Sequence, residues 1–459
     1  MNCRRRVGLG AILGILAVVA TAAPPVQFWR LDNGARVLFI ESRDLPIVDA
    51  RLIFDAGAAR DGESSGIARL TNAVLAEGAG GLNAAQLGIR FEQVGAQFGA
   101  ESLRDMAVFE LRMLAKPDSV RRAADTLAII VGQPDFPADA IERQRNRMLT
   151  DLKNKAQSPG RLAQAALMKA LYGDHPYGAP PHGTPASLAG INAQRLRAFH
   201  SGFYVGSNVV VAIVGDLDAD GAVRLAERLT RHLPVGRRAP RLPAVPVRTE
   251  SRTLHIPYDA TQATVVMGRL GIARNDADYF SLVVGNHILG GSGMVSLLFD
   301  TVREQQGLAY SVGSALTPMA AVGPFIVSAA TRHTQSDQAL NLLRDTVRAF
   351  VADGPSDAQV AAALQNLTGR FPLSMASNAA LVGRLGVIGF YGLPLDYLDR
   401  YVPRIARETR DTVHAAVRRV LPPSAWVTVI VGPESDAGAH RAASAGRDNR
   451  QGRCMRCGG

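Results

Sequence analysis

Runs of alternating or continuous apolar residues predict strands. The segments between these runs have apolar residues at helical spacing and predict helices. "AVFELRML" (107–114) and "PFIVSAAT" (324–331) have the alternation of strands. "ADAIERQRNRMLTDLKNKAQ" (138–157) and "SDAQVAAALQNLTGR" (356–370) have helical spacing, and the second begins with the Ser-x-x-Gln pattern of a capping box. Strands that alternate with pairs of helices indicate an α+β layer architecture.

The pattern occurs twice. "VDARLIFDAGAARD" (48–61) and "TQATVVMGRLGIARND" (261–276) each predict a strand followed by a helix that ends in Gly-Gly. "SNVVVAIVGDLDAD" (207–220) and "SAWVTVIVGPESDA" (424–437) each close a half with an apolar, β-branched run that stops at glycine and acidic residues. We therefore expect a duplicated α+β fold.

Between the halves lies a segment rich in proline and arginine. Residues 231–252 carry six arginines against one glutamate, a large part of the chain's net charge of +11. No aromatic residues alternate with these arginines to stack on bases, so nucleic-acid binding is not expected. We predict a solvated linker at 233–252 that joins an N-terminal domain (26–232) to a C-terminal domain (253–433).

The N-terminus has the three parts of a signal peptide. Basic "MNCRRR" precedes apolar "VGLGAILGILAVVA", and Ala20-Thr21-Ala22 forms a small-residue cleavage site. We expect residues 1–22 to be removed and the protein to be exported to a bacterial periplasm without a stable membrane span; an uncleaved anchor is the alternative. The last residues, 434–459, are small and polar and predict a disordered tail, in which Cys454 and Cys457 have no assigned role.

The segment "SSGIARLTNAVLAEGAGG" (64–81) predicts a helix that carries Arg69, Asn72 and Ala73 on one face. It is one of several ordered landmarks by which almost the whole mature chain resembles the pitrilysin/insulinase family of zinc metallopeptidases, in its short bacterial form. The resemblance implies two homologous α+β domains, each an antiparallel-rich sheet packed with helices, which enclose a chamber. The landmarks are "LDNGARVLFIESRDLPIVDARLIFDAGAARD", "GIARLTNAVLAEGA", "GAQFGAESLRDMAVFELRML", "HPYGAPPHGTPASL", "LGGSGMVSLLFDTVREQQGLAYSVGS" and the terminal strand.

Active members of this family carry H-x-x-E-H on that helix, where two imidazoles bind Zn²⁺ and the Glu activates its water. A further Glu from a later helix completes the metal site. The corresponding positions here are Arg69, Asn72, Ala73 and Thr150. No two of the nine histidines are three or four residues apart, so no other register restores the motif. We expect no metal and no cofactor in this chain.

A second family feature is intact. Arg303 and Tyr310 in "LFDTVREQQGLAYSV" match an Arg/Tyr pair that the resemblance places in the chamber near the zinc, where it contacts the substrate carbonyl and the developing oxyanion. The alternative is that Arg303 pairs with a surface carboxylate such as Glu304 while Tyr310 is half-buried in strand packing.

Two further segments contain candidate residues. "GAQFGAESLRDMAVFEL" (95–111) resembles the edge strand to which active members add the substrate, and Arg104 and Asp105 in it predict a salt-bridged bend. His175 and Tyr177 are expected to be structural.

An intact Arg/Tyr pair beside a lost metal motif favours one function. We expect a non-catalytic subunit that forms a heterodimer with a homologous, zinc-bearing H-x-x-E-H chain and acts with it on peptides or unfolded proteins. An inert structural or peptide-binding scaffold of the same fold is the alternative. A metal-independent hydrolase lacks support, because the chain has no G-x-S-x-G elbow and its body no cysteine.

Overall fold

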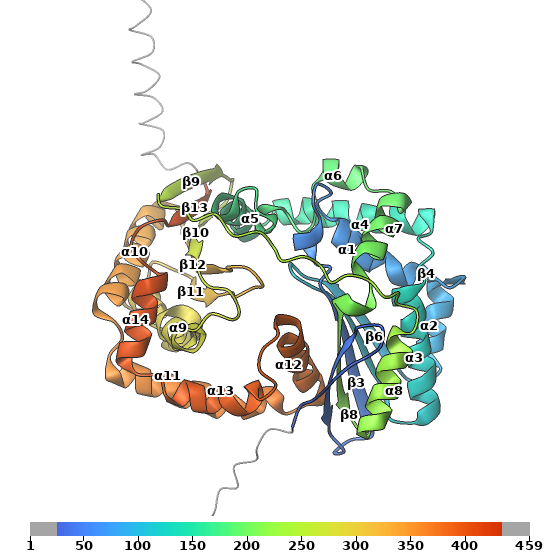
Figure 1. Ribbon diagram of the computed structural model, residues 1–459. Helices are drawn as coiled ribbons and strands as arrows, with labels where there is room; N and C mark the ends of the chain where they lie inside the picture. Colours follow the sequence, from blue (N-terminus) through green and yellow to red (C-terminus); the bar gives the residue numbers. More distant parts are fainter. Residues whose placement is uncertain (1–24, 434–459) are drawn as a thin grey trace, which may run out of the picture.

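The computed structural model describes residues 25–433, so the predicted signal peptide (1–22) and the predicted tail with Cys454 and Cys457 lie outside the described residues. Two β-sheets with helices packed on them stand opposite each other (Figure 1). The first sheet is built from residues 27–215 and the second from residues 252–432. This mixed architecture, with mainly antiparallel strands, confirms the predicted fold class.

The first sheet has six strands, and every neighbouring pair is antiparallel except β2 and β8. The strand predicted at 107–114 is β7. In spatial order the strands are β1 (Gln27–Arg30), β2 (Arg36–Glu41), β8 (Val209–Gly215), β3 (Ile47–Phe54), β7 (Ala107–Leu114) and β6 (Gln97–Ser102).

The second sheet repeats the order and the directions of the first. Its strands are β9 (Arg252–Pro257), β13 (Val427–Gly432), β10 (Gln262–Leu270), β12 (Pro324–Arg332) and β11 (Ser311–Leu316), and only β9 and β13 are parallel. They correspond in turn to β2, β8, β3, β7 and β6. The strand pairs that the sequence repeat matched, β3 with β10 and β8 with β13, therefore occupy equivalent places, and the predicted duplication is confirmed.

Each sheet has an outer face covered by helices of its own half (Figure 1). On the first sheet these are α1 (Ile67–Val74), α2 (Ala84–Glu92), α3 (Pro117–Gly132), α4 (Ala138–Ala156), α7 (Ala193–Phe203) and α8 (Ala219–Thr230). On the second sheet they are α9 (Tyr279–Asn286), α10 (Ser336–Asp353) and α14 (Arg410–Val420). Helices α11 (Asp357–Arg370) and α13 (Tyr397–Ala406) pack against α9. The short α6 (Pro185–Ala189) lies beside α4.

The inner faces are covered by an exchange of helices between the halves. Helix α12 (Asn378–Tyr391) packs Leu381, Leu385 and Ile388 on β2, β3 and β8 of the first sheet. Helix α5 (Pro159–Tyr172) packs Leu167 and other residues on β10 and β13 of the second sheet. Because both faces of the central strands are thus buried, β8 is apolar at successive positions rather than at alternate ones.

Of two local predictions, the structure confirms one and corrects the other. Helix α11 begins with the predicted capping box: the Gln359 N–H donates to Ser356 Oγ at 3.2 Å, and the Ser356 N–H donates to Gln359 Oε1 at 2.9 Å. The helix predicted at 64–81 is shorter: α1 ends at Val74, a 3₁₀ turn covers Leu75–Glu77, and Gly78–Ala79 forms the short strand β4 with β5 (Leu82–Asn83).

Residues 234–251 form neither helix nor strand and connect α8 to β9. Over residues 25–433, a search for membrane-spanning helices finds no single candidate. Only Asp357–Met375 and Asn378–Tyr391 together reach the required length and apolarity, as a pair bent by 108°.

Candidate functional site

Helix α1, which carries the positions of the metal motif, is held at its N-terminus by an aspartate upstream of it. Asp61 accepts hydrogen bonds from the Gly66 N–H at 2.7 Å and the Ala68 N–H at 3.0 Å. Glycine is favoured at position 66 because its φ of +94° is left-handed and a Cβ there would lie 3.0 Å from the Gly183 Cα. The serines at 64 and 65 do not cap this helix. Burial raises the pKa of Asp61 to about 7, although both hydrogen bonds act to lower it.

The four positions of the predicted degenerate motif carry no metal ligands. Arg69 and Ala73 are half-buried on one side of α1, and the buried Asn72 donates to the Glu101 carbonyl of edge strand β6 at 3.3 Å. Thr150 is exposed on α4, and its hydroxyl donates to the Asn146 carbonyl at 3.0 Å. Within residues 25–433, no cluster of three or more His, Cys, Asp or Glu side chains is arranged to hold a metal ion.

Positive charge gathers around Arg69 instead. Burial, and then the charge of Arg69, lowers the pKa of Lys155 to about 8. The same two causes, with Lys155 as the third, lower the pKa of His182 to about 4. Arg161 adds to both effects, and Asp151 is the carboxylate that opposes them. A region that disfavours protonation of a lysine and a histidine also disfavours a divalent cation. Sequence reasoning missed Lys155 and His182, which belong to no motif.

Arg303 and Tyr310 are brought together. Arg303 lies in a π-helical segment (Phe299–Gln305), and Tyr310 immediately precedes β11. The guanidinium carbon of Arg303 is 5.9 Å from the centre of the Tyr310 ring and 4.7 Å from that of Phe299. Both predicted site residues are exposed, Tyr310 by 75%.

This geometry contradicts the alternative interpretation, in which Arg303 pairs with a surface carboxylate and Tyr310 is half-buried in strand packing. Among the described residues no carboxylate, Glu304 included, forms an ion pair with Arg303. Tyr310 is not half-buried in strand packing. A charged fork of donors and a hydroxyl therefore face solvent side by side, where they can bind a carbonyl or an oxyanion of another molecule.

The predicted salt bridge between Arg104 and Asp105 is wrong. Arg104 donates to the carbonyl of Tyr177 at 2.7 Å, while Asp105 accepts from the Tyr177 hydroxyl at 2.6 Å. Asp105 also accepts from the Ala320 N–H at 2.9 Å and from the Tyr391 hydroxyl at 3.2 Å, both in the second half of the chain. The bend links the two halves, because a buried carboxylate must find donors and these are the ones that surround it.

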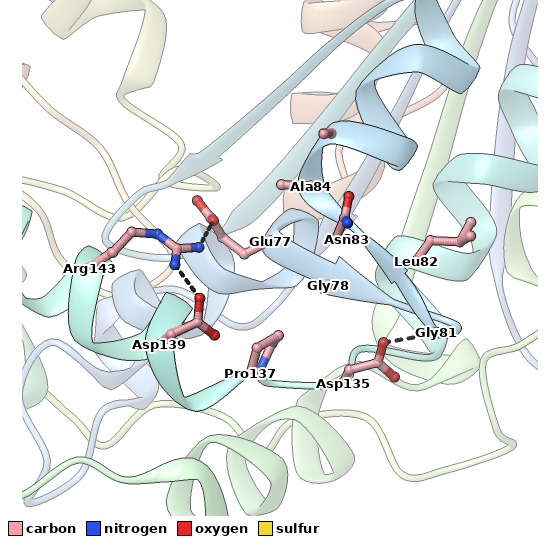
Figure 2. A pocket seen from close by; sticks show the side chains of 11 residues that line it. Glu77, Gly78, Gly81, Leu82, Asn83, Ala84, Asp135, Pro137, Asp139 and Arg143 are labelled. Carbon is pink, nitrogen blue, oxygen red and sulfur yellow. Dashed lines mark hydrogen bonds and ion pairs between the residues drawn. The ribbon is translucent and has the colours of Figure 1, made fainter.

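A cavity of about 370 Å³ lies beyond the C-terminal end of α1 (Figure 2). Its carboxylates have partners: Glu77 and Asp139 both pair with Arg143, and Asp135 accepts from the Gly81 N–H at 3.0 Å. With its acidic groups satisfied in this way, the cavity offers no vacant set of oxygen ligands.

A duplicated α+β fold, whose first helix has Arg69, Asn72 and Ala73 at the metal positions, defines an inactive-type metallopeptidase domain. The chain belongs to peptidase family M16, the pitrilysin/insulinase family. The family "Insulinase (Peptidase family M16)" matches residues 36–184, and "Peptidase M16 inactive domain" matches residues 190–367.

Known relatives agree with this assignment. A crystal structure of a peptidase M16 inactive domain from Pseudomonas fluorescens is 40% identical, covers 89% of this chain and 98% of its own, and superposes with a TM-score of 0.87. A protease from Helicobacter pylori shares the fold at 16% identity, with a TM-score of 0.83 over 90% of this chain and 100% of its own. An uncharacterized zinc protease of Streptomyces coelicolor is 29% identical over 76% of this chain and 77% of its own.

Proposed function

We propose that this chain is the non-catalytic subunit of a heterodimeric, periplasmic zinc metalloprotease. A homologous chain with an intact H-x-x-E-H motif holds the zinc, and the pair degrades peptides or unfolded proteins. The observation that carries the proposal is the exposed Arg303–Tyr310 pair, without an ion-pair partner for Arg303 among the described residues, in a chain whose own motif positions hold no metal ligands. The inactive-domain match and the relatives named as zinc proteases support it.

In this proposal the partner's H-x-x-E-H residues would hold the zinc, which would supply the Lewis acid for the scissile carbonyl and for a water molecule. Arg303 binds a substrate carbonyl through its fork of N–H donors, and Tyr310 donates its hydroxyl proton in a hydrogen bond to the oxygen that becomes negative. A fixed positive charge and a hydroxyl at that oxygen stabilise the transition state more than the ground state. The 5.9 Å between guanidinium and ring allows both groups to reach one substrate.

The test is to co-express this chain with an H-x-x-E-H homologue, isolate the complex by gel filtration and measure peptide cleavage. Arg303→Ala and Tyr310→Phe are each expected to lower kcat by about 10²–10³-fold while the complex still forms. Arg348→Ala is the control, because Arg348 is an exposed arginine of the same half whose one ion pair within residues 25–433 is with Asp345 on its own helix. It should leave cleavage unchanged.

Two results would reject the proposal. One is full activity in both variants, and the other is a partner that is equally active without this chain; either leaves the scaffold alternative. Metal analysis of this chain alone is a further check, since one tightly bound Zn²⁺ per chain would contradict the assignment of the metal to the partner.

A further inference from the structure

A cavity of about 840 Å³ lies between the two halves, and its charged residues are strongly unbalanced. It is bordered by the start of β2, the end of β3, the linker and the loops of the second half that precede α9 and β12. Its lining includes one carboxylate, Asp55, and five arginines: Arg36, Arg60, Arg238, Arg241 and Arg274.

Only one of these arginines is neutralised. Arg60 donates twice to Asp55, at 2.7 Å from Nε to Oδ1 and at 2.7 Å from Nη2 to Oδ2. The other four form no ion pair within the described part of the chain. The cavity therefore has an excess of four positive charges.

The two inner arginines are held in place and keep donors free. Arg36 donates from Nη1 to the Gly389 carbonyl at 2.8 Å, while its buried Nε has no hydrogen-bond partner. Burial, followed by the charges of Arg238 and Arg30, lowers the pKa of Arg36 to about 10. Arg274 donates to the Tyr397 hydroxyl at 2.9 Å, with its guanidinium carbon 4.0 Å from the centre of the Tyr279 ring. Such fixed guanidinium groups lose little entropy when they bind an anion.

The linker supplies the two outer arginines. It is attached between and after them: the Ala239 N–H donates to Asn208 Oδ1 at 3.0 Å, and the Pro243 carbonyl lies 3.1 Å from His175 Nε2. Arg238 and Arg241 are themselves exposed. The predicted solvated linker is thus held against the body at these points, and two of its arginines are located at the cavity.

We propose that this cavity binds a small organic polyanion with phosphate or carboxylate groups at more than one position. Its volume is within the range of small-ligand sites. Guanidinium groups recognise phosphate and carboxylate through paired N–H donors. A ligand held by Arg36, Arg274 and the linker arginines would contact both halves and raise the thermal stability of the whole chain. The site needs no partner chain, so the binding proposal can be tested and rejected independently of the proposed protease function.

The experiment titrates the purified chain with inorganic pyrophosphate and with citrate at low ionic strength, by calorimetry and by thermal shift. We expect saturable binding of at least one probe, and the preferred probe identifies phosphate or carboxylate as the recognised group. Arg238→Gln/Arg241→Gln should weaken binding about tenfold or more. Arg237→Gln/Arg252→Gln removes the same charge from exposed positions outside the cavity and should change the affinity by less than about twofold.

Two outcomes would overturn the proposal. The first is that neither probe binds. The second is an equal loss of affinity in both double variants, which would show attraction to the overall positive charge rather than a site. Arg36→Gln gives a third arm. It should also weaken the binding of the preferred probe, because Arg36 lines the cavity; unchanged binding of both probes in this variant would contradict the site as proposed.

Discussion

Asp105 is a buried carboxylate that accepts hydrogen bonds from both halves of the chain, and its removal gives a sharp test of the structure. Asp105 is only 5% exposed. It accepts hydrogen bonds from Tyr177 in its own half and from the Ala320 N–H and Tyr391 in the other. Asp105→Ala leaves these three donors without their acceptor.

The cost follows from the burial of each donor. An unsatisfied buried donor costs about 1–3 kcal/mol, and a partly exposed donor costs less because water replaces the lost acceptor. Tyr177 is fully buried, whereas Tyr391 is half-buried and Ala320 is exposed. We therefore expect Asp105→Ala to lower the free energy of unfolding by about 2–4 kcal/mol. Asp105→Asn keeps one carbonyl oxygen for the Ala320 N–H, and it should cost about 1–2 kcal/mol.

The assay is urea unfolding followed by circular dichroism, with Asp174→Ala as the control. Asp174 is fully exposed, so its loss should change the unfolding free energy by no more than about 0.5 kcal/mol. A loss below about 1 kcal/mol in Asp105→Ala would refute the account of the contact.

The same aspartate predicts a pH dependence. Burial raises the pKa of Asp105, so the folded chain holds this proton more tightly than the unfolded chain does. The stability of the wild type should therefore fall as the pH rises above the ordinary aspartate range. Asp105→Asn lacks this proton, and the difference in unfolding free energy between the two proteins should narrow over that pH window. A difference that widens would contradict the assigned direction.

Two further predictions concern helix α1. Arg69→Gln should raise the titration midpoints of His182 and Lys155 above about 4 and about 8, but not to their ordinary values, because burial remains; midpoints that do not move in an NMR titration would refute the charge cluster. Restoring all four motif positions should create measurable zinc affinity in a chelator competition, and a folded variant without it would show that the motif register is wrong. The substitutions are Arg69→His, Asn72→Glu, Ala73→His and Thr150→Glu.

Much of the fold could be predicted because apolar periodicity repeats in order along the chain. The strand at 107–114 and most of β12 follow from alternation, and the order of the second sheet follows from the repeat. The exchange of α5 and α12 could not be predicted. An apolar helix face shows that a helix is buried, but both sheets offer similar apolar surfaces and periodicity does not say which of them it covers.

The candidate site, like the fold, could be predicted from the sequence only in part. Arg303 and Tyr310 are seven residues apart, and a local turn brings them together, so their spacing was informative. Arg69 acts on the pKa values of Lys155 and His182 only because separate elements pack together, and no spacing rule connects these residues. The segment around the linker arginines has the composition of a solvated linker. Their place at a cavity depends on the hydrogen bonds of the linker with Asn208 and His175, which only the folded chain reveals.

The exchange of helices also determines when the inner face of the first sheet can be covered during biosynthesis. The first sheet is complete in sequence at Gly215, but the helix that covers its inner face begins only at Asn378, about 160 residues later. At roughly 5–20 residues per second, a ribosome needs about 8–30 s to make that stretch. During this interval Leu38, Ile53 and Val210 lack their final cover, so a nascent chain released early would present an apolar sheet to its neighbours.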